Sequence, residues 1–303
     1  MSPKNILLLA LAGLTIFYIA DWAYLAVKRL RAGGHGSDEP VRPTAIHLTI
    51  GFVTNFFDTL GIGSFATTTA AYKFWKLIPD EQIPGTLNVG HAINSIIQSF
   101  IYITIINVEF QTLFLMIAAA TLGAWLGAGI VAGLPRRKVQ LGMGTALIGA
   151  ATIMFLQLMS LVPGGGEAEA LSGVKLALGL GGNFMLGAFM TIGIGLYAPC
   201  MILVSMLGMN PTAAFPIMMG SCAFLMPVAS LQFVRKNAYN LRAAISLAVG
   251  GPLAVLIAAF IVRSLPLYAV RWLVVFVVVY TAWSLLRSAA AERARAQVAG
   301  ATV

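Results

Sequence analysis

The stretch GFVTNFFDTLGIGSFATTT, residues 51–69, contains the tripeptide Gly-Ile-Gly at 61–63, and GAFMTIGIGLYAPC, residues 187–200, repeats that tripeptide at 193–195. Both copies lie inside long apolar segments. Other landmarks recur at a separation of roughly 130 residues, which marks an internal duplication; they pair Pro84 with Pro211, Gly90 with Gly220, Gly123 with Gly251, and Leu134-Pro135 with Leu265-Pro266. Duplicated membrane halves that glycine interrupts are typical of secondary transporters, whose site lies between the halves.

The composition indicates an integral membrane protein. Of the 303 residues 59% are hydrophobic and 10% are charged, which is more apolar material than a soluble protein of this length can bury. Uncharged runs at 113–134 and 139–162 reach the roughly 20 residues that cross a bilayer as a helix. The alternation of apolar and polar residues that a membrane barrel needs does not occur. We therefore predict an all-α fold.

Charge, cysteines and motifs exclude several classes of function. The net charge of +9 is carried by loops and the C-terminal tail, which fits the positive-inside rule better than nucleic-acid binding. Cys200 and Cys222 lie in apolar segments, so we expect buried thiols and no metal site. Because no recognisable Ser-His-Asp motif or phosphate loop occurs, we expect neither an enzyme nor a self-contained ATP-driven pump, and no cofactor.

An apolar run at 5–27 opens the chain, and basic residues follow it at Lys28, Arg29, Arg31 and Arg42. A cleaved signal peptide would carry its charge ahead of a shorter core, so we predict an uncleaved anchor helix with its N-terminus outside. Eight further apolar segments follow, at 44–77, 84–107, 110–134, 139–162, 174–208, 212–234, 241–263 and 268–287.

The loop charges set the topology. If all of these segments crossed the membrane, the basic loops after Lys28 and at 136–138 would lie on opposite sides, against the positive-inside rule. The conflict disappears if the two segments that carry Gly-Ile-Gly enter and return as hairpins. Each repeat is then a re-entrant or broken hairpin plus three transmembrane helices, and the odd number of crossings inverts the second repeat. The alternative is two long, tilted or kinked spans, which would give parallel repeats.

The predicted organisation is an anchor helix with a basic loop at 1–43, a first repeat at 44–162, a linker at 163–173, a second repeat at 174–287 and a basic cytoplasmic tail at 288–303. The protein would be a multi-pass component of the cytoplasmic (inner) membrane.

The hairpin tips are the candidate site for an anion. A helix that begins just after a glycine turn directs free amides and the positive end of its dipole toward the turn. The first tip, Gly61 and Gly63, leads into Ser64, Thr67 and Thr68, and the second, Gly193 and Gly195, leads into Tyr197 and Cys200. The alternative is that these glycines only allow close helix packing.

Polar residues next to the tips add further candidates. Asn88, His91, Asn94, Ser95 and Gln98 share one face of a helix, which must look inward because lipid would not solvate it. His91 could carry a proton or be a satisfied neutral histidine. The amides of Asn94 and Gln98 could contact substrate or bond between helices.

Asp58 stands one turn after Asn55 and just before the first glycine turn. A carboxylate at membrane depth is costly unless it is paired or functional. Asp58 is therefore either a residue that couples transport to protons or a cap that locks the hairpin tip.

The pattern resembles that of the TauE/SafE family of sulfite and organosulfonate transporters. The shared features are spaced glycines that lead into Gly-x-Gly, a proline about four residues on and a later Leu-Pro; here they are Gly51, Gly61, Gly63 and 134–135, then Gly187, Gly193, Gly195, Pro199 and 265–266. The resemblance covers 44–287 and leaves out the first helix. Ser64 and Leu196 stand where the family usually has a third glycine, and Thr67 stands in place of the first proline.

The resemblance implies export or uptake of sulfite or of an organosulfonate such as sulfoacetate. We therefore expect a secondary transporter that works by alternating access, with proton coupling left open. Its partners would be a small anion and the lipid bilayer, with no nucleic acid and with a homodimer left open. The alternatives are a passive anion channel, a scaffold without transport, and a transporter of another small anion or of a soft metal cation.

Overall fold

A computed structural model describes residues 2–31, 42–131, 136–159, 161, 166–190 and 194–300. These residues contain no strand beyond one isolated bridge between Ala168 and Met209, so the predicted all-α class is confirmed. The helices are α1 (Pro3–Arg31), α2 (Ala45–Thr59), α3 (Ser64–Phe74), η1 (Asp80–Gln82), α4 (Ile83–Ile105), α5 (Phe110–Val131), α6 (Arg136–Leu158), α7 (Gly173–Met190), α8 (Tyr197–Met206), η2 (Pro211–Ala213), α9 (Ala214–Arg235), α10 (Leu241–Ser264) and α11 (Leu267–Gly300).

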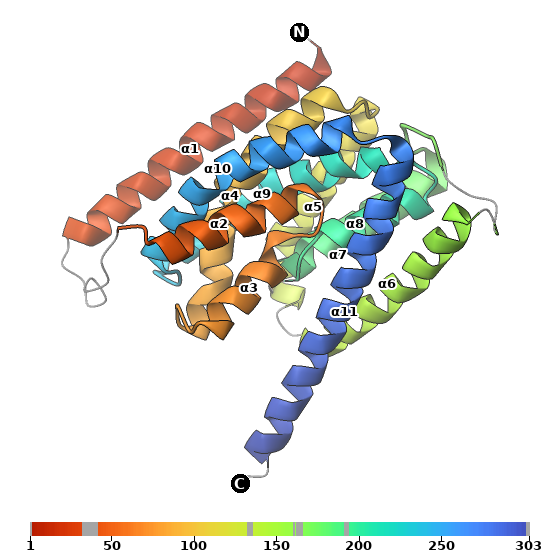
Figure 1. Ribbon diagram of the computed structural model, residues 1–303. Coiled ribbons are helices and arrows are strands. Elements are labelled where there is room, and N and C mark those ends of the chain that lie inside the picture. The colour runs from red at the N-terminus through yellow and green to blue at the C-terminus, as the bar shows by residue number, and fades with distance from the viewer. Residues whose placement is uncertain are drawn as a thin grey trace.

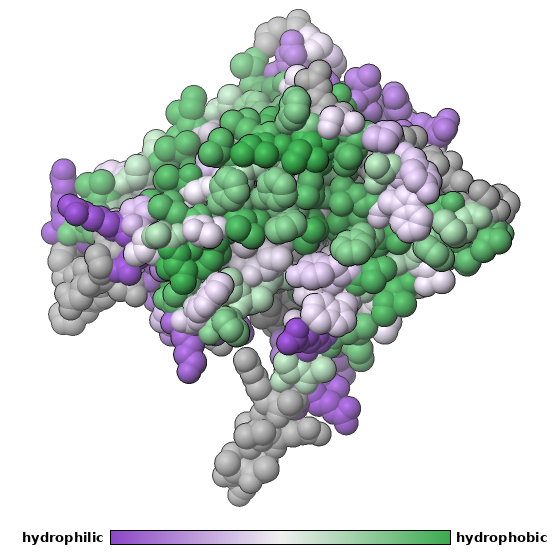
Figure 2. All heavy atoms as spheres, viewed as in Figure 1, coloured by the Kyte–Doolittle hydropathy of each residue, from purple (hydrophilic) through white to green (hydrophobic). Residues whose placement is uncertain are grey.

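Five helical segments of the described chain are long and apolar enough to cross a membrane: Pro3–Arg31, Gly173–Met190, Pro211–Arg235, Leu241–Val262 and Trp272–Arg293. In Figure 2 hydrophobic side chains cover most of the viewed face, and hydrophilic ones gather toward its edges. The chain is therefore a multi-pass membrane protein. Because α7 is long enough to cross by itself, the re-entrant form of the second hairpin stays a prediction.

The two halves have the same order of elements. In the first half, a pair of helices broken at residues 60–63, α2 and α3, is followed by α4, α5 and α6. In the second half α7, which ends at Met190, and α8, which begins at Tyr197, are followed by α9, α10 and α11. In the sequence, each Gly-Ile-Gly copy stands between the two helices of its pair. This order supports the predicted repeats, whose inversion stays a prediction.

The halves exchange helices across their interface. Helix α2 of the first half packs along α10 of the second, and α7 packs along α5 in the same way, while α4 pairs with α9 and α6 with α11. Figure 1 shows α2 lying alongside α10. Each hairpin is thus held mainly by the other half of the chain.

Glycines make both of these exchanged contacts possible. A Cβ on Gly123 of α5 would overlap the carbonyl oxygen of Phe184, and one on Gly187 of α7 would overlap that of Ala120. In the contact between α2 and α10, a Cβ on Gly250 of α10 would lie 2.6 Å from the carbonyl oxygen of Leu48. A Cβ on Gly51 of α2 would lie 3.0 Å from the carbonyl oxygen of Ser246. Such close backbone approach is what small residues provide in membrane bundles. By these contacts the counterpart of Gly123 is Gly250, and not Gly251 as the sequence separation indicated.

Helix α1 packs against the bundle, chiefly on α9 and α4. The fully buried Tyr18 donates its hydroxyl to the carbonyl of Val89 at 3.0 Å, and Trp22 donates its indole N–H to the hydroxyl of Tyr239 at 3.2 Å. These two bonds fix α1 to both halves of the chain.

Candidate functional site

The first hairpin tip is a glycine-capped helix end. Helix α2 closes with hydrogen bonds from the amide of Gly61 to the carbonyl of Asp58 at 2.8 Å and from the amide of Ile62 to that of Phe57 at 3.1 Å, the two bonds of a Schellman motif. Gly61 and Gly63 have φ of 96° and 86°, a region that strains residues with a Cβ. These two glycines therefore set the turn from α2 into α3.

The second tip repeats part of this arrangement. The amide of Ile194 donates to the carbonyl of Phe189 at 3.2 Å, the counterpart of the bond from Ile62 to Phe57. Helix α8 then begins at Tyr197. The predicted site residue Gly193 lies outside the described residues. A Cβ on Gly195 would meet no heavy atom within 4 Å, so open space lies in front of it.

The carboxylate of Asp58 lies at the N-terminus of α3. Its Oδ1 accepts a hydrogen bond from the backbone amide of Ser64, the first residue of α3, and its Oδ2 accepts one from Nε2 of Gln98 at 2.9 Å. Asp58 is only 2% exposed. The amide that we expected to be open to an anion is therefore taken by the chain's own carboxylate, as the capping interpretation of Asp58 requires.

Gln98 connects this carboxylate to the second tip. Its Nε2 also donates to the hydroxyl of Thr59 at 2.9 Å, and its Oε1 accepts the hydroxyl of Tyr197 at 2.8 Å. Four predicted residues, Asp58, Ser64, Gln98 and Tyr197, are thus brought together from α2, α3, α4 and α8. The two tips are joined by one chain of hydrogen bonds.

A small cavity of about 20 Å³ lies between the tips. Five of our candidates line it, namely Asp58, Gly63, Ser64, Gly195 and Tyr197. This volume suits a single water and is too small for a sulfur oxyanion. Ser95, Met190, Cys222 and Met226 complete the wall; of these only Ser95 lay in the polar face that we singled out. Cys200 is buried but is absent from this lining.

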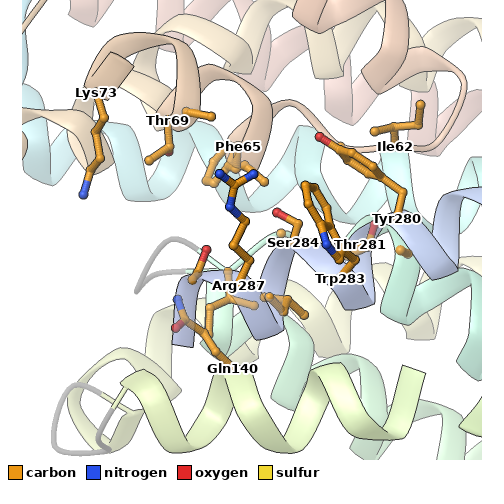
Figure 3. A pocket seen from close by; sticks show the side chains of 18 of the residues that line it. Ile62, Phe65, Thr69, Lys73, Gln140, Tyr280, Thr281, Trp283, Ser284 and Arg287 are labelled. Carbon is orange, nitrogen blue, oxygen red and sulfur yellow. The ribbon is translucent and has the colours of Figure 1, made fainter. Parts of the chain in front are cut away.

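A second cavity of about 750 Å³ begins at the tips, where Ile62, Gly63, Ile194 and Gly195 line it. Its other walls come from α3, α6, α8 and α11, and the candidate Tyr197 is among the α8 residues. The exposed side chains of Lys73 and Arg287 place its far end at the molecular surface. Figure 3 shows Arg287 reaching from α11 toward α3, across from Gln140 on α6. This cavity is large enough for a sulfur oxyanion or an organosulfonate, and it ends at both glycine turns.

His91 is fully buried between Asn55 and Thr68 and lines neither of these cavities. Its Nδ1 lies 3.0 Å from Oδ1 of Asn55, and its Nε2 lies 3.0 Å from the Thr68 hydroxyl. Because Nδ2 of Asn55 donates to the carbonyl of Gly51, Oδ1 is the acceptor, and His91 carries its proton on Nδ1. Both ring nitrogens of the neutral imidazole are satisfied, which supports the structural interpretation of His91.

Two further candidates, Asn94 and Thr67, line neither of the cavities at the tips. Nδ2 of Asn94 donates across to the carbonyl of Leu247 on α10 at 2.9 Å, which is the interhelical role that we left open. The hydroxyl of Thr67 donates to the carbonyl of Ser64 at 3.0 Å and to that of the tip residue Gly63 at 3.3 Å. Thr67 lines a separate, apolar cavity of about 470 Å³ beside α2 and α11.

The motif analysis missed a pair of residues in the second half. Nδ2 of Asn183 donates to the hydroxyl of Ser221 at 3.1 Å and to the carbonyl of Met116 at 2.7 Å. Asn183 corresponds to Asn55, and Ser221 corresponds to His91. Both pairs show the separation of roughly 130 residues that relates the glycines. Applying that separation to polar residues as well as glycines would have found this pair.

The comparisons with known proteins bear on the first half. The sequence model described as "Sulfite exporter TauE/SafE" matches residues 1–154. The match takes in α1, which our resemblance over 44–287 had left out. No curated protein and no solved structure matches the chain. Since the family match spans 154 of the 303 residues, slightly more than half, the chain belongs to the sulfite exporter TauE/SafE family.

Proposed function

We propose that this protein is a secondary transporter that moves sulfite or a small organosulfonate such as sulfoacetate across the cytoplasmic membrane by alternating access. The observation that carries the proposal is the cavity of about 750 Å³, because both glycine turns lie at its inner end and basic side chains lie at its outer end. An anion that enters would travel from a positively charged surface toward two helix N-termini, where backbone amides and the helix dipole stabilise negative charge.

The anion would bind where the carboxylate of Asp58 lies in the present conformation. Carboxylate and sulfite both present oxygen acceptors, so they compete for the amide of Ser64. A proton that neutralises Asp58 weakens its hold on that amide and lets the anion replace it. Anion and proton would then move together, with Asp58 as the coupling residue.

The cavity of about 20 Å³ between the tips indicates that the site is closed on one side in this conformation. Passage requires the hydrogen bond from Tyr197 to Gln98 to open, so that the two tips can separate. The exchanged packing of the halves supports a movement of the two repeats against each other. With the N-terminus outside and the C-terminus in the cytoplasm, as the loop charges predict, the larger cavity faces the cytoplasm.

The test is flux of radioactive sulfite in proteoliposomes that contain the purified protein. We expect Gly195→Leu to reduce the flux at least tenfold, because the leucine side chain fills the open space at the second tip while a Cβ at that position meets nothing. Gly149→Leu is the matched control, since Gly149 is exposed on α6 and its Cβ also meets nothing. If Gly195→Leu transports as well as Gly149→Leu, the site does not lie at the tips.

A passive channel is the alternative that this assay also addresses. A coupled transporter accumulates sulfite against its concentration gradient when a proton gradient is imposed, whereas a channel only equilibrates it. If the sulfite concentration inside the vesicles never exceeds the concentration outside, at any imposed pH difference, the channel is favoured.

A further inference from the structure

Arg287 lines the larger cavity and has no partner of opposite charge in the described part of the chain. Among the described residues no hydrogen bond or ion pair involves its guanidinium, whose central carbon lies 5.2 Å from the ring centroid of Trp283. Stacking on an indole holds the guanidinium in place and leaves its N–H groups free to bind an acceptor. In Figure 3 the side chain points from α11 into the space below α3.

Two buried polar groups in the wall of the same cavity also lack partners among the described residues. Within that part of the chain, the hydroxyl oxygen of Thr281 and Oε1 of Gln140 have no hydrogen bond, and Gln140 is 3% exposed. Buried polar atoms are costly unless something satisfies them, so both side chains have hydrogen-bonding capacity that a rotation can turn into the cavity. After such a rotation an oxyanion can accept from the hydroxyl of Thr281 and from the NH₂ group of Gln140.

The described residues of the cavity wall carry one net positive charge. Lys73 and Glu292 also line the cavity with opposite charges, so the charges of the described lining residues sum to that of Arg287. On α11, Thr281, Ser284 and Ser288 follow at spacings of three and four and therefore lie on one helical face. The cavity thus offers a cation and a stripe of hydroxyl groups.

We propose that Arg287 is the centre of a capture site for a small sulfur oxyanion, with Thr281 and Gln140 as further groups of the same cavity wall, separate from the glycine tips and placed before them on the route inward. The inference deepens the proposed function, because the captured anion is the transported one. A planar guanidinium can donate two parallel hydrogen bonds to one oxyanion, which a lysine cannot match. Arg287 therefore raises the local anion concentration and favours sulfite over uncharged solutes.

The test compares Arg287→Gln and Arg287→Lys with the wild type in two assays, equilibrium binding of radioactive sulfite and proteoliposome flux from the Arg287 side. We expect Arg287→Gln to raise both the Kd and the KM about tenfold at low ionic strength, and the maximal flux to stay within about twofold. Arg287→Lys keeps the charge and should raise the Kd and the KM by about threefold. Arg235→Gln is the matched control, since it removes an exposed arginine at the end of α9, outside the cavity.

The outcomes separate this inference from the proposed function. If sulfite is transported but Arg287→Gln matches Arg235→Gln in KM and Kd, the capture site is wrong and the transporter stands. If binding weakens as expected while no variant moves sulfite, the capture site stands and the transport proposal fails. The same measurements in vesicles of phosphatidylcholine, with and without phosphatidylglycerol, test whether a lipid phosphate fills the site instead. A sulfite Kd that responds to the lipid but not to Arg287→Gln would overturn the proposal.

Discussion

Oδ1 of Asp58 accepts the backbone amide of Ser64, so one carboxylate joins the last turn of α2 to the first residue of α3 across the glycine turn. The bond does two things. It satisfies an amide that a helix N-terminus leaves without an intrahelical partner, and it places negative charge where the helix dipole favours it. The same position is the one that a transported anion would take.

Replacing Asp58 with alanine should therefore destabilise the protein. The change removes the cap of α3 and leaves the hydroxyl of Thr59 as the remaining acceptor for the buried Nε2 of Gln98. We therefore expect the free energy of unfolding to fall by about 2 kcal/mol. Asp58→Asn keeps an oxygen that can accept from the amide of Ser64, so its free energy of unfolding should fall by less. Thermal unfolding in detergent measures both, and equal stability of Asp58→Ala and the wild type would contradict the cap.

Asp58→Asn should also uncouple transport from protons. An asparagine amide can take the place of the carboxylate beside Ser64, but it cannot exchange a proton at this position. We expect sulfite to flow down its own gradient in this variant with no response to an imposed pH difference. A response equal to that of the wild type would show that another group couples the flux.

The close contacts of the exchanged helices predict a glycine series. Gly123→Ala and Gly187→Ala each push a methyl group into the backbone of the facing helix and should destabilise by about 1–3 kcal/mol. Gly142→Ala on α6 is the control, since its Cβ meets nothing within 4 Å, and it should stay within about 0.5 kcal/mol of the wild type. Equal melting temperatures for all three variants would refute the close packing of α5 on α7.

His91 can be tested through its partner. Thr68→Val keeps the shape of the side chain but leaves Nε2 of the buried imidazole without a donor, at a cost of about 1–3 kcal/mol. If His91 is structural, sulfite flux in the folded fraction should keep its response to pH. Thr145→Val, at an exposed position on α6, provides the control for stability. Loss of the pH response in Thr68→Val alone would make His91 a coupling residue.

Glu109, which precedes α5, predicts a dependence of stability on pH. The slight burial of its carboxylate raises its pKa, but hydrogen bonds from the amides of Thr112 and Gln111 outweigh this, and the pKa lies below its ordinary value. The stabilisation is therefore present above the pKa of an unfolded glutamate and is lost as the pH falls through the lower pKa of the folded state. The melting temperature of Glu109→Gln should be below that of the wild type at pH 7 and approach it in acid. A difference in melting temperature between the two proteins that stays constant from pH 7 to pH 3 would exclude a stabilising role for these hydrogen bonds to Glu109.

The helix breaks could be predicted from sequence because their cause is local. Glycine adopts positive φ at little cost, so two glycines one residue apart favour a turn, and Gly61 and Gly63 both have positive φ in the structure. The candidates Ser64 and Tyr197 follow from the same local argument, since they come directly after the turns.

The hydrogen bonds that connect Asp58 through Gln98 to Tyr197 could not be predicted from the sequence, because they depend on how three helices from both halves come together. The sequence left the role of Asp58 undecided for the same reason: the turn between α2 and α3 brings its carboxylate back to the amide of Ser64 only in the folded hairpin. In the sequence, Arg287 is only the last residue of the predicted second repeat, next to a basic tail. Only the placement of α11 beside α3 and α6 gives it a cavity.

The exchange of helices also bears on how such a chain arose. Since α2 is covered by α10 and α7 by α5, neither half could bury its own glycine-lined faces if it existed alone. On the hypothesis that the halves arose by duplication, a half-length ancestor would be complete only as a pair of identical chains, each covering the hairpin of the other. Fusion into one chain would then free the copies to differ, as they do where the first half has Asp58 and His91 and the second, 132 and 130 residues later, has Met190 and Ser221.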